Sequence, residues 1–276
     1  MARSALINVM VQAARKAGRV LARDFGEVEN LQVSLKGPGD FVTAADLRAE
    51  KILIEELGRA RPGYPILTEE KGAIPGPDQT HRWIVDPLDG TTNFLHGFPL
   101  FSISIALERE GQIVAGLIYN PVTDDLFTGE RGKGAFLNDR RIRVAARTSF
   151  SQALLTLGLP HSGRGNHALA LRELQAVMGR VAGLRRTGSA ALDLAYVAAG
   201  RFDGFWEHAL APWDIAAGIL MVREAGGFVT DATGGTAMFE TGSIVAGNET
   251  IHGELLKLLK SAASTESRPS VTPLPY

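Results

Sequence analysis

The sequence contains no cysteine, no long apolar run and almost no net charge. Without cysteine, the chain cannot form a disulfide, a zinc–thiolate site or a thiol nucleophile, which fits a cytoplasmic protein. No stretch reaches the about 18 apolar residues that a membrane-spanning helix requires, so no membrane partner is expected. The 29 basic and 30 acidic residues give a formal net charge of -1, which argues against a strong overall attraction to nucleic acid.

The composition is that of a globular protein. Of the 276 residues, 45% are hydrophobic and 21% are charged, which suffices for one large domain or two closely packed halves. The first 25 residues place apolar side chains at helical intervals and interrupt them with Arg15, Lys16 and Arg19. This pattern predicts an amphipathic helix rather than a signal peptide, whose apolar stretch would be unbroken.

The first half, residues 1–147, is predicted to combine helices with a sheet. After the first helix, a second helix should begin near Thr43 and end before Pro62. Apolar and polar residues alternate over 102–144, with turn residues between the runs, which predicts an antiparallel meander.

The second half, residues 148–262, alternates strand and helix patterns. Helices are predicted over 166–181 and 212–227, the latter with proline near its start and glycines at its end. The polar, proline-rich residues 263–276 are predicted to form a mobile tail. The predicted fold class is therefore α+β, with an α+β half followed by an α/β half.

An acidic corner stands out in the stretch WIVDPLDGTTNF, residues 83–94. Pro87 has no backbone N–H, so the strand that precedes it is predicted to end at Asp86 and to aim that carboxylate off the sheet. Asp89 can point at the same place, and the carbonyl of Leu88 is left unpaired. Carboxylate and carbonyl oxygens are the ligands that Mg²⁺ prefers.

Residues on both sides extend this corner. Gly90 permits a close approach, and Thr91 can open a helix whose first N–H groups attract phosphate. By itself, an acid pair at this spacing is more often a turn and a helix cap. Three further acids stand at the ends of predicted elements, namely Glu69, Asp46 and Asp214. Their placement favours a site in which several acids converge on a metal and the phosphate that it activates.

Four segments in this order resemble the inositol monophosphatase family, and most of all its bacterial inositol-1-monophosphatase branch. They are GDFVTAAD at 39–46, LTEEKG at 67–72, the stretch 83–107 around the acidic corner, and 185–227 with its W-D-x-A-A-G helix. The resemblance covers roughly residues 1–262. It implies a layered α/β/α/β/α sandwich of the inositol monophosphatase and fructose-1,6-bisphosphatase type.

The resemblance also implies the activity. It predicts a homodimeric, Mg²⁺-dependent phosphomonoesterase that is inhibited by Li⁺ and hydrolyses myo-inositol 1-phosphate and related sugar or polyol phosphates. A water activated by the metal would attack in line, and two or three Mg²⁺ ions would bind in each active site.

Roles for individual residues carry over from the matching motifs. The residues that match metal ligands are Glu69, Asp86, Leu88 through its carbonyl, Asp89 and Asp214. Thr91 and Glu69 match the pair that orients the attacking water, and Asp46 matches the partner of Thr91. The residues expected to contact substrate are Leu88, Asp89, Gly90, Thr91, Arg185, Gly188, Ser189, Ala190, Glu207 and Asp214. His208 and Pro212 fall where the family varies.

Two alternatives stay open on the sequence. The first is another phosphate ester, such as histidinol phosphate, fructose 1,6-bisphosphate or 3'-phosphoadenosine 5'-phosphate, because all of them are hydrolysed at the same acidic corner. The second is a regulatory protein that binds the transcription machinery, with or without the enzymatic activity.

Overall fold

The computed structural model describes residues 3–27, 33–37, 40–161, 163 and 165–264. Its helices, in chain order, are α1 (Ala5–Phe25), α2 (Ala44–Ala60), α3 (Thr91–Leu95), α4 (His167–Met178), α5 (Ala190–Ala198), α6 (Pro212–Glu224), α7 (Met238–Thr241) and α8 (Glu249–Ser264), with one 3-10 turn, η2 (Phe150–Gln152).

The strands form three sheets. They are β1 (Val33–Gly37), β2 (Asp40–Thr43), β3 (Ile66–Thr68), β4 (Gly72–Ile74), β5 (His81–Asp89), β6 (Ser102–Arg109), β7 (Gln112–Asn120), β8 (Asp125–Glu130), β9 (Gly134–Leu137), β10 (Arg140–Arg141), β11 (Leu154–Leu157), β12 (Gly183–Arg185), β13 (Gly204–Glu207), β14 (Phe228–Thr230) and β15 (Ile244–Gly247). A small hairpin pairs β1 with β2, eight strands follow the order β10-β9-β8-β7-β6-β5-β3-β4, and five follow β12-β11-β13-β15-β14.

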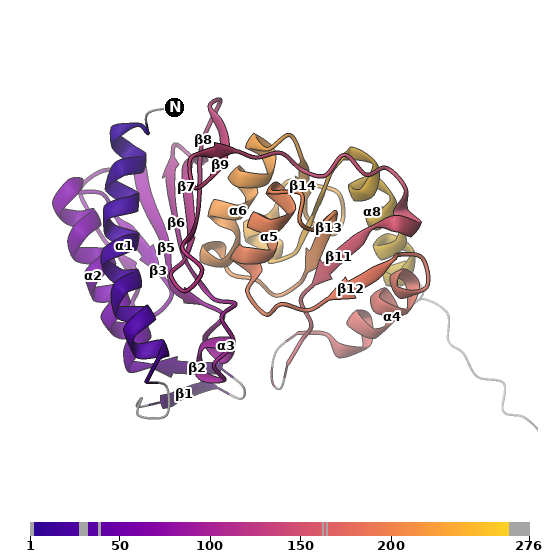
Figure 1. Cartoon of the computed structure of the whole chain (residues 1–276), viewed down its shortest axis with the longest axis horizontal. Helices are drawn as coiled ribbons and strands as arrows, with labels where there is room; N and C mark the ends of the chain where they lie inside the picture. Colours follow the sequence, from indigo (N-terminus) through magenta and orange to yellow (C-terminus); the bar gives the residue numbers. More distant parts are fainter. Residues whose placement is uncertain (1–2, 28–32, 38–39, 162, 164, 265–276) are drawn as a thin grey trace, which may run out of the picture.

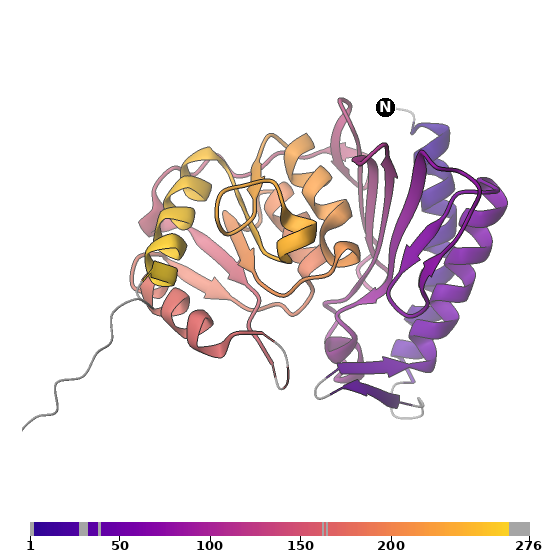
Figure 2. The same cartoon turned by 180° about the vertical axis from the view of Figure 1, so that it is seen from behind.

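Helices and sheets stack in five alternating layers (Figure 1). Helices α1 and α2 cover one face of the large sheet, and α5 and α6 lie between the two sheets. Helices α4 and α8 cover the far face of the smaller sheet, as Figure 2 shows from behind. The sandwich α/β/α/β/α is thus confirmed.

Most predicted elements are confirmed at nearly their predicted bounds. Helices α1, α2, α4 and α6 lie where the periodicity placed them, and β6 to β10 form the antiparallel meander. The short elements β4, β14 and α7 were not predicted. Residues 265–276 of the predicted tail lie outside the described residues, whereas 263 and 264 still belong to α8. The division at 147/148 stays a prediction.

Capping explains where several of the helices begin. The side chain of Ser4 accepts a hydrogen bond from the N–H of Ile7 at the start of α1. Thr43 and Asp46 form a reciprocal capping box at the start of α2. Pro212 opens α6, where its missing N–H costs nothing. These devices set the helix starts from local sequence alone.

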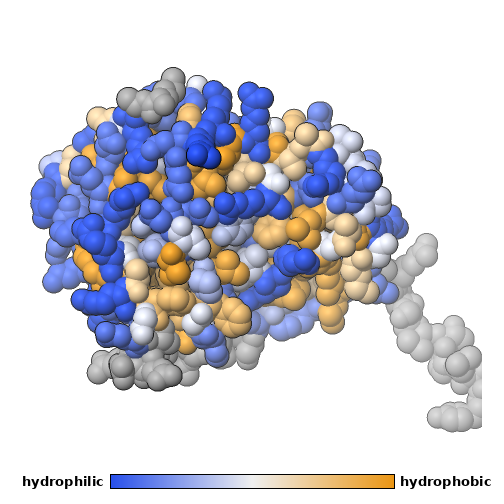
Figure 3. Space-filling view, in the orientation of Figure 1, coloured by the Kyte–Doolittle hydropathy of each residue, from blue (hydrophilic) through white to orange (hydrophobic). Residues whose placement is uncertain are grey.

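Helices cover both faces of the large sheet. Because successive side chains of a strand point to opposite sides, each strand contributes to the core on both faces. Along β5, Trp83 and Val85 belong to the core cluster under α1 and α2, whereas Ile84 belongs to the cluster around α5 and α6. The solvent-facing surface, in contrast to these buried faces of the sheet, is polar: Figure 3 shows hydrophilic residues over much of the α1 and α2 side. In the described part of the chain, no helix has the length and apolar character to cross a membrane.

Strand β5 continues past the proline at which it was predicted to stop, and this prediction was wrong. Asp86 pairs with Ser104 and Asp89 pairs with Ser102, so three steps on β5 oppose two on β6. Because a bulge of this kind leaves a residue out of the ladder, Pro87 is accommodated without breaking the sheet. The bulge is what presents both carboxylates at the end of the strand.

The parallel neighbour of β5 brings a third acid to the same edge. Thr68 at the end of β3 pairs with Val85 of β5. Glu69 follows Thr68 and Asp86 follows Val85, so the two acids come side by side where the pairing of β3 with β5 ends.

Candidate active site

A single cleft collects most of the predicted site residues. It lies where β3 and β5 end and where α3, α5 and α6 begin. Its lining consists of Glu69, Asp86, Leu88, Asp89, Gly90, Thr91, Thr92, Gly158, Leu159, Pro160, His161, Gly165, Arg186, Gly188, Ala190, Glu207, His208, Ala209, Leu210 and Asp214. Both halves of the chain contribute walls to it.

Four carboxylates of this cleft, those of Glu69, Asp86, Asp89 and Asp214, lie close enough together for their charges to interact. Burial raises the pKa of Asp86 well above its ordinary value, and the charges of Glu69, Asp89 and Asp214 raise it further. Burial also raises the pKa of Asp89 to about 6, against the lowering effect of its hydrogen bond from Ser189. Mutual repulsion of this kind is relieved by a cation.

The donor chemistry of this group fits a hard divalent cation. All the candidate ligands are oxygens, which is the set that Mg²⁺ takes in proteins. Within the described residues, however, no group of three or more His, Cys, Asp or Glu side chains is arranged so that it could hold a metal ion. The ligand roles of Glu69, Asp86, Leu88, Asp89 and Asp214 therefore remain predictions, supported by their shared cleft and shared charge.

The cleft acids are anchored by the backbone of the elements that carry them. The carboxylate of Asp86 accepts from the N–H of Leu88 at 2.9 Å. Asp214 accepts from the N–H of Ala211 at 2.7 Å and so caps α6. Asp89 accepts from the N–H of Ala191 at 2.9 Å and thereby reaches the start of α5. These three aspartates thus have fixed positions before any cation binds.

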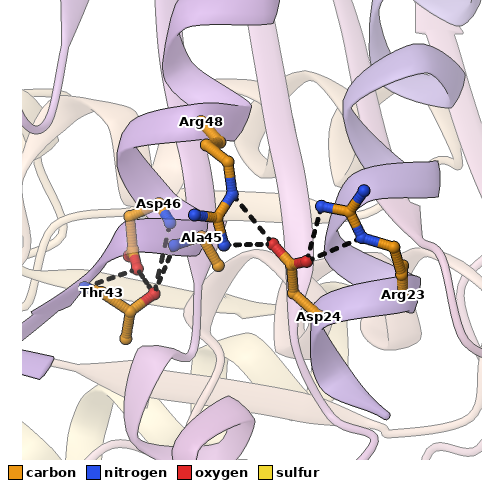
Figure 4. Close-up of polar contacts among 6 residues, drawn as sticks. All are labelled: Arg23, Asp24, Thr43, Ala45, Asp46 and Arg48. Carbon is orange, nitrogen blue, oxygen red and sulfur yellow. Dashed lines mark hydrogen bonds and ion pairs between the residues drawn. The ribbon is translucent and has the colours of Figure 1, made fainter. Parts of the chain in front are cut away.

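Thr91 and Asp46 come together as predicted from the family motifs. The Thr91 hydroxyl lies 3.2 Å from the Asp46 carboxylate and 3.1 Å from the Leu88 carbonyl. Asp46 in turn accepts from the N–H of Thr43 at 2.9 Å and from its hydroxyl, as Figure 4 shows. Burial raises the pKa of Asp46 to about 6 although both bonds from Thr43 lower it.

The start of α3 needs glycine at its cap. Gly90 adopts φ +93°, a left-handed conformation that other residues rarely adopt. A Cβ there would also lie 3.0 Å from the carbonyl oxygen of Leu100 and 3.3 Å from that of Gly188. The absence of a side chain at Gly90 therefore lets the backbone at Gly188, in the second half of the chain, pack closely against the start of α3.

Two residues predicted on the substrate side do not line the cleft. Arg185 is exposed and donates to the carbonyl of Leu184 at 2.9 Å, whereas its neighbour Arg186 lines the cleft. Because successive residues of an extended segment point to opposite sides, Arg186 faces the cleft and Arg185 does not. Ser189 is buried, and its hydroxyl donates to Asp89 rather than facing the cleft. Gly188 and Ala190 do line it.

Glu207 lies in the cleft with its carboxyl group directly over Gly158. A Cβ on Gly158 would be 1.8 Å from the carboxyl carbon of Glu207. Burial raises the pKa of Glu207 well above its ordinary value, as do the nearby Asp193 and Asp214. The carboxyl group thus occupies the space that any other residue at position 158 would fill.

Several residues that support the site were not singled out from the sequence. Glu50 is fully buried and accepts from the N–H groups of Glu70 and Lys71 at 3.1 and 3.0 Å, which holds the turn after Glu69. Asn93 donates to the carbonyls of Leu100 and Thr187, both at 2.7 Å.

Only Asn93 carried a sequence signal, because it stands inside the acidic-corner motif. Glu50 occupies an ordinary helical position, and its target is 20 residues away in the chain.

A buried acid beneath the Gly188 turn gives a prediction about stability. Asp193 accepts from the hydroxyls of Thr156 and Thr187 at 2.9 and 2.6 Å. Burial raises its pKa to about 8. Unfolded, an aspartate ionises near about 4, so between these pH values the folded state binds the extra proton. Its contribution to the free energy of unfolding therefore falls as pH rises from about 4 to about 8.

We expect Asp193→Asn to remove this pH dependence, since asparagine keeps the acceptor oxygen and cannot ionise. At pH 8 the variant should unfold with about 2–5 kcal/mol more free energy than the wild type, and at pH 4 the two should agree. Urea melts of the metal-free protein across this range measure the difference, with Glu55→Gln, an exposed acid of α2, as the control. Parallel pH profiles for wild type and variant would contradict the protonated state of Asp193.

Comparisons with known proteins give the following matches. The inositol monophosphatase family model matches residues 2–264. An inositol-1-monophosphatase of Mesorhizobium japonicum is 66% identical over 264 residues, which are 96% of this chain and 99% of the relative. The Nus factor SuhB of Escherichia coli K12 is 43% identical over 259 residues, 94% of this chain and 97% of the relative. The crystal structure of the extragenic suppressor protein suhB from Bartonella henselae matches with a TM-score of 0.91 at 62% identity, covering 93% of this chain and 99% of that one.

Proposed function

The chain belongs to the inositol monophosphatase family, and from this premise we propose that it hydrolyses myo-inositol 1-phosphate to inositol and phosphate. The observation that carries the proposal is one cleft in which four carboxylates face Glu207 and the Gly188 turn. The acids suit the phosphate end of the substrate with its cation, and Glu207 suits the hydroxyls at the other end.

The family is metal-dependent, and we propose Mg²⁺ as the ion, with two or three per active site. Glu69, Asp86 and the Leu88 carbonyl would hold one ion, and Asp86, Asp89 and Asp214 the second. Bound there, Mg²⁺ neutralises the phosphate, lowers the pKa of a water and stabilises the leaving alkoxide.

The protein's own groups position the attacking water. Asp46 and the Leu88 carbonyl both stand ready to accept the Thr91 proton, which leaves the Thr91 oxygen free to accept from a water. Because Asp46 is itself held by Thr43, the direction of the Thr91 hydroxyl is set before substrate binds. Glu69 lines the same cleft and would accept the second proton of that water.

A substrate panel tests this proposal. With Mg²⁺ present, inositol 1-phosphate should give the highest kcat/KM when compared with histidinol phosphate, fructose 1,6-bisphosphate, 3'-phosphoadenosine 5'-phosphate and p-nitrophenyl phosphate. A preference for one of the other esters would move the assignment to that ester. No hydrolysis of any of them would overturn it.

Glu207→Ala should reduce the efficiency on inositol 1-phosphate selectively. A hydrogen bond to a charged group is worth roughly 1.5–3 kcal/mol, so kcat/KM should fall by about 10- to 150-fold. On p-nitrophenyl phosphate, which has no ring hydroxyls, it should change little. Equal losses on both substrates would show that Glu207 supports the fold or the cation site instead.

Gly158→Ala tests the same carboxylate from the opposite side. Because the new methyl group would take the place of the Glu207 carboxyl, this variant should show the same selective loss. The double variant should lose no more than either single one, because both changes remove one interaction. Additive losses would mean that the two residues act separately.

A regulatory role is the second candidate, and the specific observation is the 43% identity to a protein named Nus factor SuhB. We propose a partner in the transcription machinery for this role. A pull-down with the wild type and with an inactive variant tests it. On the family resemblance we also propose that the protein is a homodimer in the cytoplasm. Light scattering of the purified protein tests the dimer.

A further inference from the structure

A smaller compartment beneath α4 adjoins the active cleft. The residues that line both spaces are Gly158, Leu159, Pro160, Gly165, His208 and Ala209. Beyond this wall the compartment is lined by residues that do not reach the cleft, namely Leu169, Ala170, Glu173 and Trp206, with Asn166 at its rim. A molecule bound by its phosphate in the cleft would have to extend past His208 to enter this space of different character.

The walls of this compartment are mainly carbon. Leu159, Pro160, Leu169 and Ala170 are half-buried, so their apolar atoms face the open space, and Trp206 closes the base. The catalytic cleft has the opposite character, because acids and glycine backbone make up much of its surface. A polar polyol therefore gains little from the compartment, whereas an apolar or aromatic group is removed from water there.

One polar pair fixes the shape of the opening. Glu173 of α4 is only 2% exposed, and its two carboxylate oxygens lie 2.9 and 3.1 Å from Nε2 of His208. A buried carboxylate is stable only when it is hydrogen-bonded, so this contact holds the imidazole in place. The next residue, Ala209, has φ +60°, a conformation that non-glycine residues rarely adopt. The contact with Glu173 thus holds the imidazole ring between the two spaces.

We propose that this compartment is a second substrate subsite, which takes an aromatic or apolar part of the alcohol of a phosphate monoester. This proposal rests on the proposed phosphatase function. It means that the enzyme hydrolyses aryl phosphates with two fused rings better than those with one ring. His208, held by Glu173, is the positioning residue that separates this subsite from the polyol site at Glu207.

The first test needs only the wild-type enzyme with Mg²⁺. Phenyl and 2-naphthyl phosphate have leaving groups of similar acidity, so the ratio of their kcat/KM values reports where the second ring goes. Each fully buried CH₂-sized group favours binding by about fourfold, so partial burial of the second ring should raise kcat/KM about tenfold. A ratio near one would mean that the second ring stays in water, and it would overturn the proposal.

The second test fills the compartment. Ala170 lines only this space, and Ala170→Leu should abolish the naphthyl preference while it leaves phenyl phosphate and inositol 1-phosphate within about twofold. Ala168→Leu, the same change at an exposed position of α4 outside the lining, is the matched control and should retain the preference. The naphthyl preference surviving in Ala170→Leu, or equal losses on all three esters, would contradict the subsite.

These outcomes are separate from the failure of the proposed function. If inositol 1-phosphate is not hydrolysed but the aryl phosphates are, the inositol assignment fails and the subsite is still tested by the naphthyl ratio. If inositol 1-phosphate is preferred and the ratio is near one, only the subsite fails.

Discussion

Asp214→Asn is expected to abolish turnover without loosening the fold. The carboxylate lies in the cleft with Asp86 and Asp89, and its charge raises the pKa of Asp86. A catalytic cation supplies several kcal/mol of charge stabilisation, so losing one anionic ligand should lower kcat/KM by at least about a thousandfold. Assays with inositol 1-phosphate and with p-nitrophenyl phosphate should agree, because both depend on the phosphate end.

The stability of the metal-free variant separates a ligand from a structural cap. Asp214 accepts from the N–H of Ala211, and asparagine keeps an oxygen for this bond. Substitution also removes one of several repelling charges, so the Tm without metal should stay level or rise. Asp89→Asn should behave in the same way, because its bond from Ala191 is likewise retained. A fall of several degrees in the metal-free Tm would identify these acids as structural caps.

Removal of the metal is expected to have an effect of the same size. Turnover should cease after exhaustive EDTA treatment and return with Mg²⁺, while excess Mg²⁺ and Li⁺ should inhibit. Since the cation binds only the folded protein, Mg²⁺ at about 100 times its Kd should add roughly 2.7 kcal/mol to the free energy of unfolding.

Thermal melts with and without Mg²⁺ measure this gain directly. Asp214→Asn provides the internal control, because its gain should be much smaller than that of the wild type. Turnover that survives EDTA, or an equal gain in both proteins, would show that the cleft acids do not hold a catalytic cation.

The sequence by itself determined the helix starts and the residues of the acidic corner. Thr43 with Asp46, and Pro212 at the start of α6, act through bonds within a single turn, so their effect can be read from neighbouring letters. The same holds for position 90, where the left-handed turn into α3 favours glycine. The family motifs then predicted which acids bind the metal, because a motif keeps the spacing of residues even where it cannot give their distances.

Only the tertiary structure decided which groups meet across the chain. The bulge in β5 depends on the register of β6, and the place of Glu69 depends on the pairing of β3 with β5. The direction of a side chain on a strand reverses with each residue, which is why Arg186 lines the cleft and Arg185 does not.

The contacts of Glu207 with Gly158 and of His208 with Glu173 join residues 49 and 35 positions apart. No local pattern records such a contact, because it is set by how the layers pack. The sequence thus determined which chemistry the chain carries, and the packing of the two sheets decided how the cleft is shaped for a substrate.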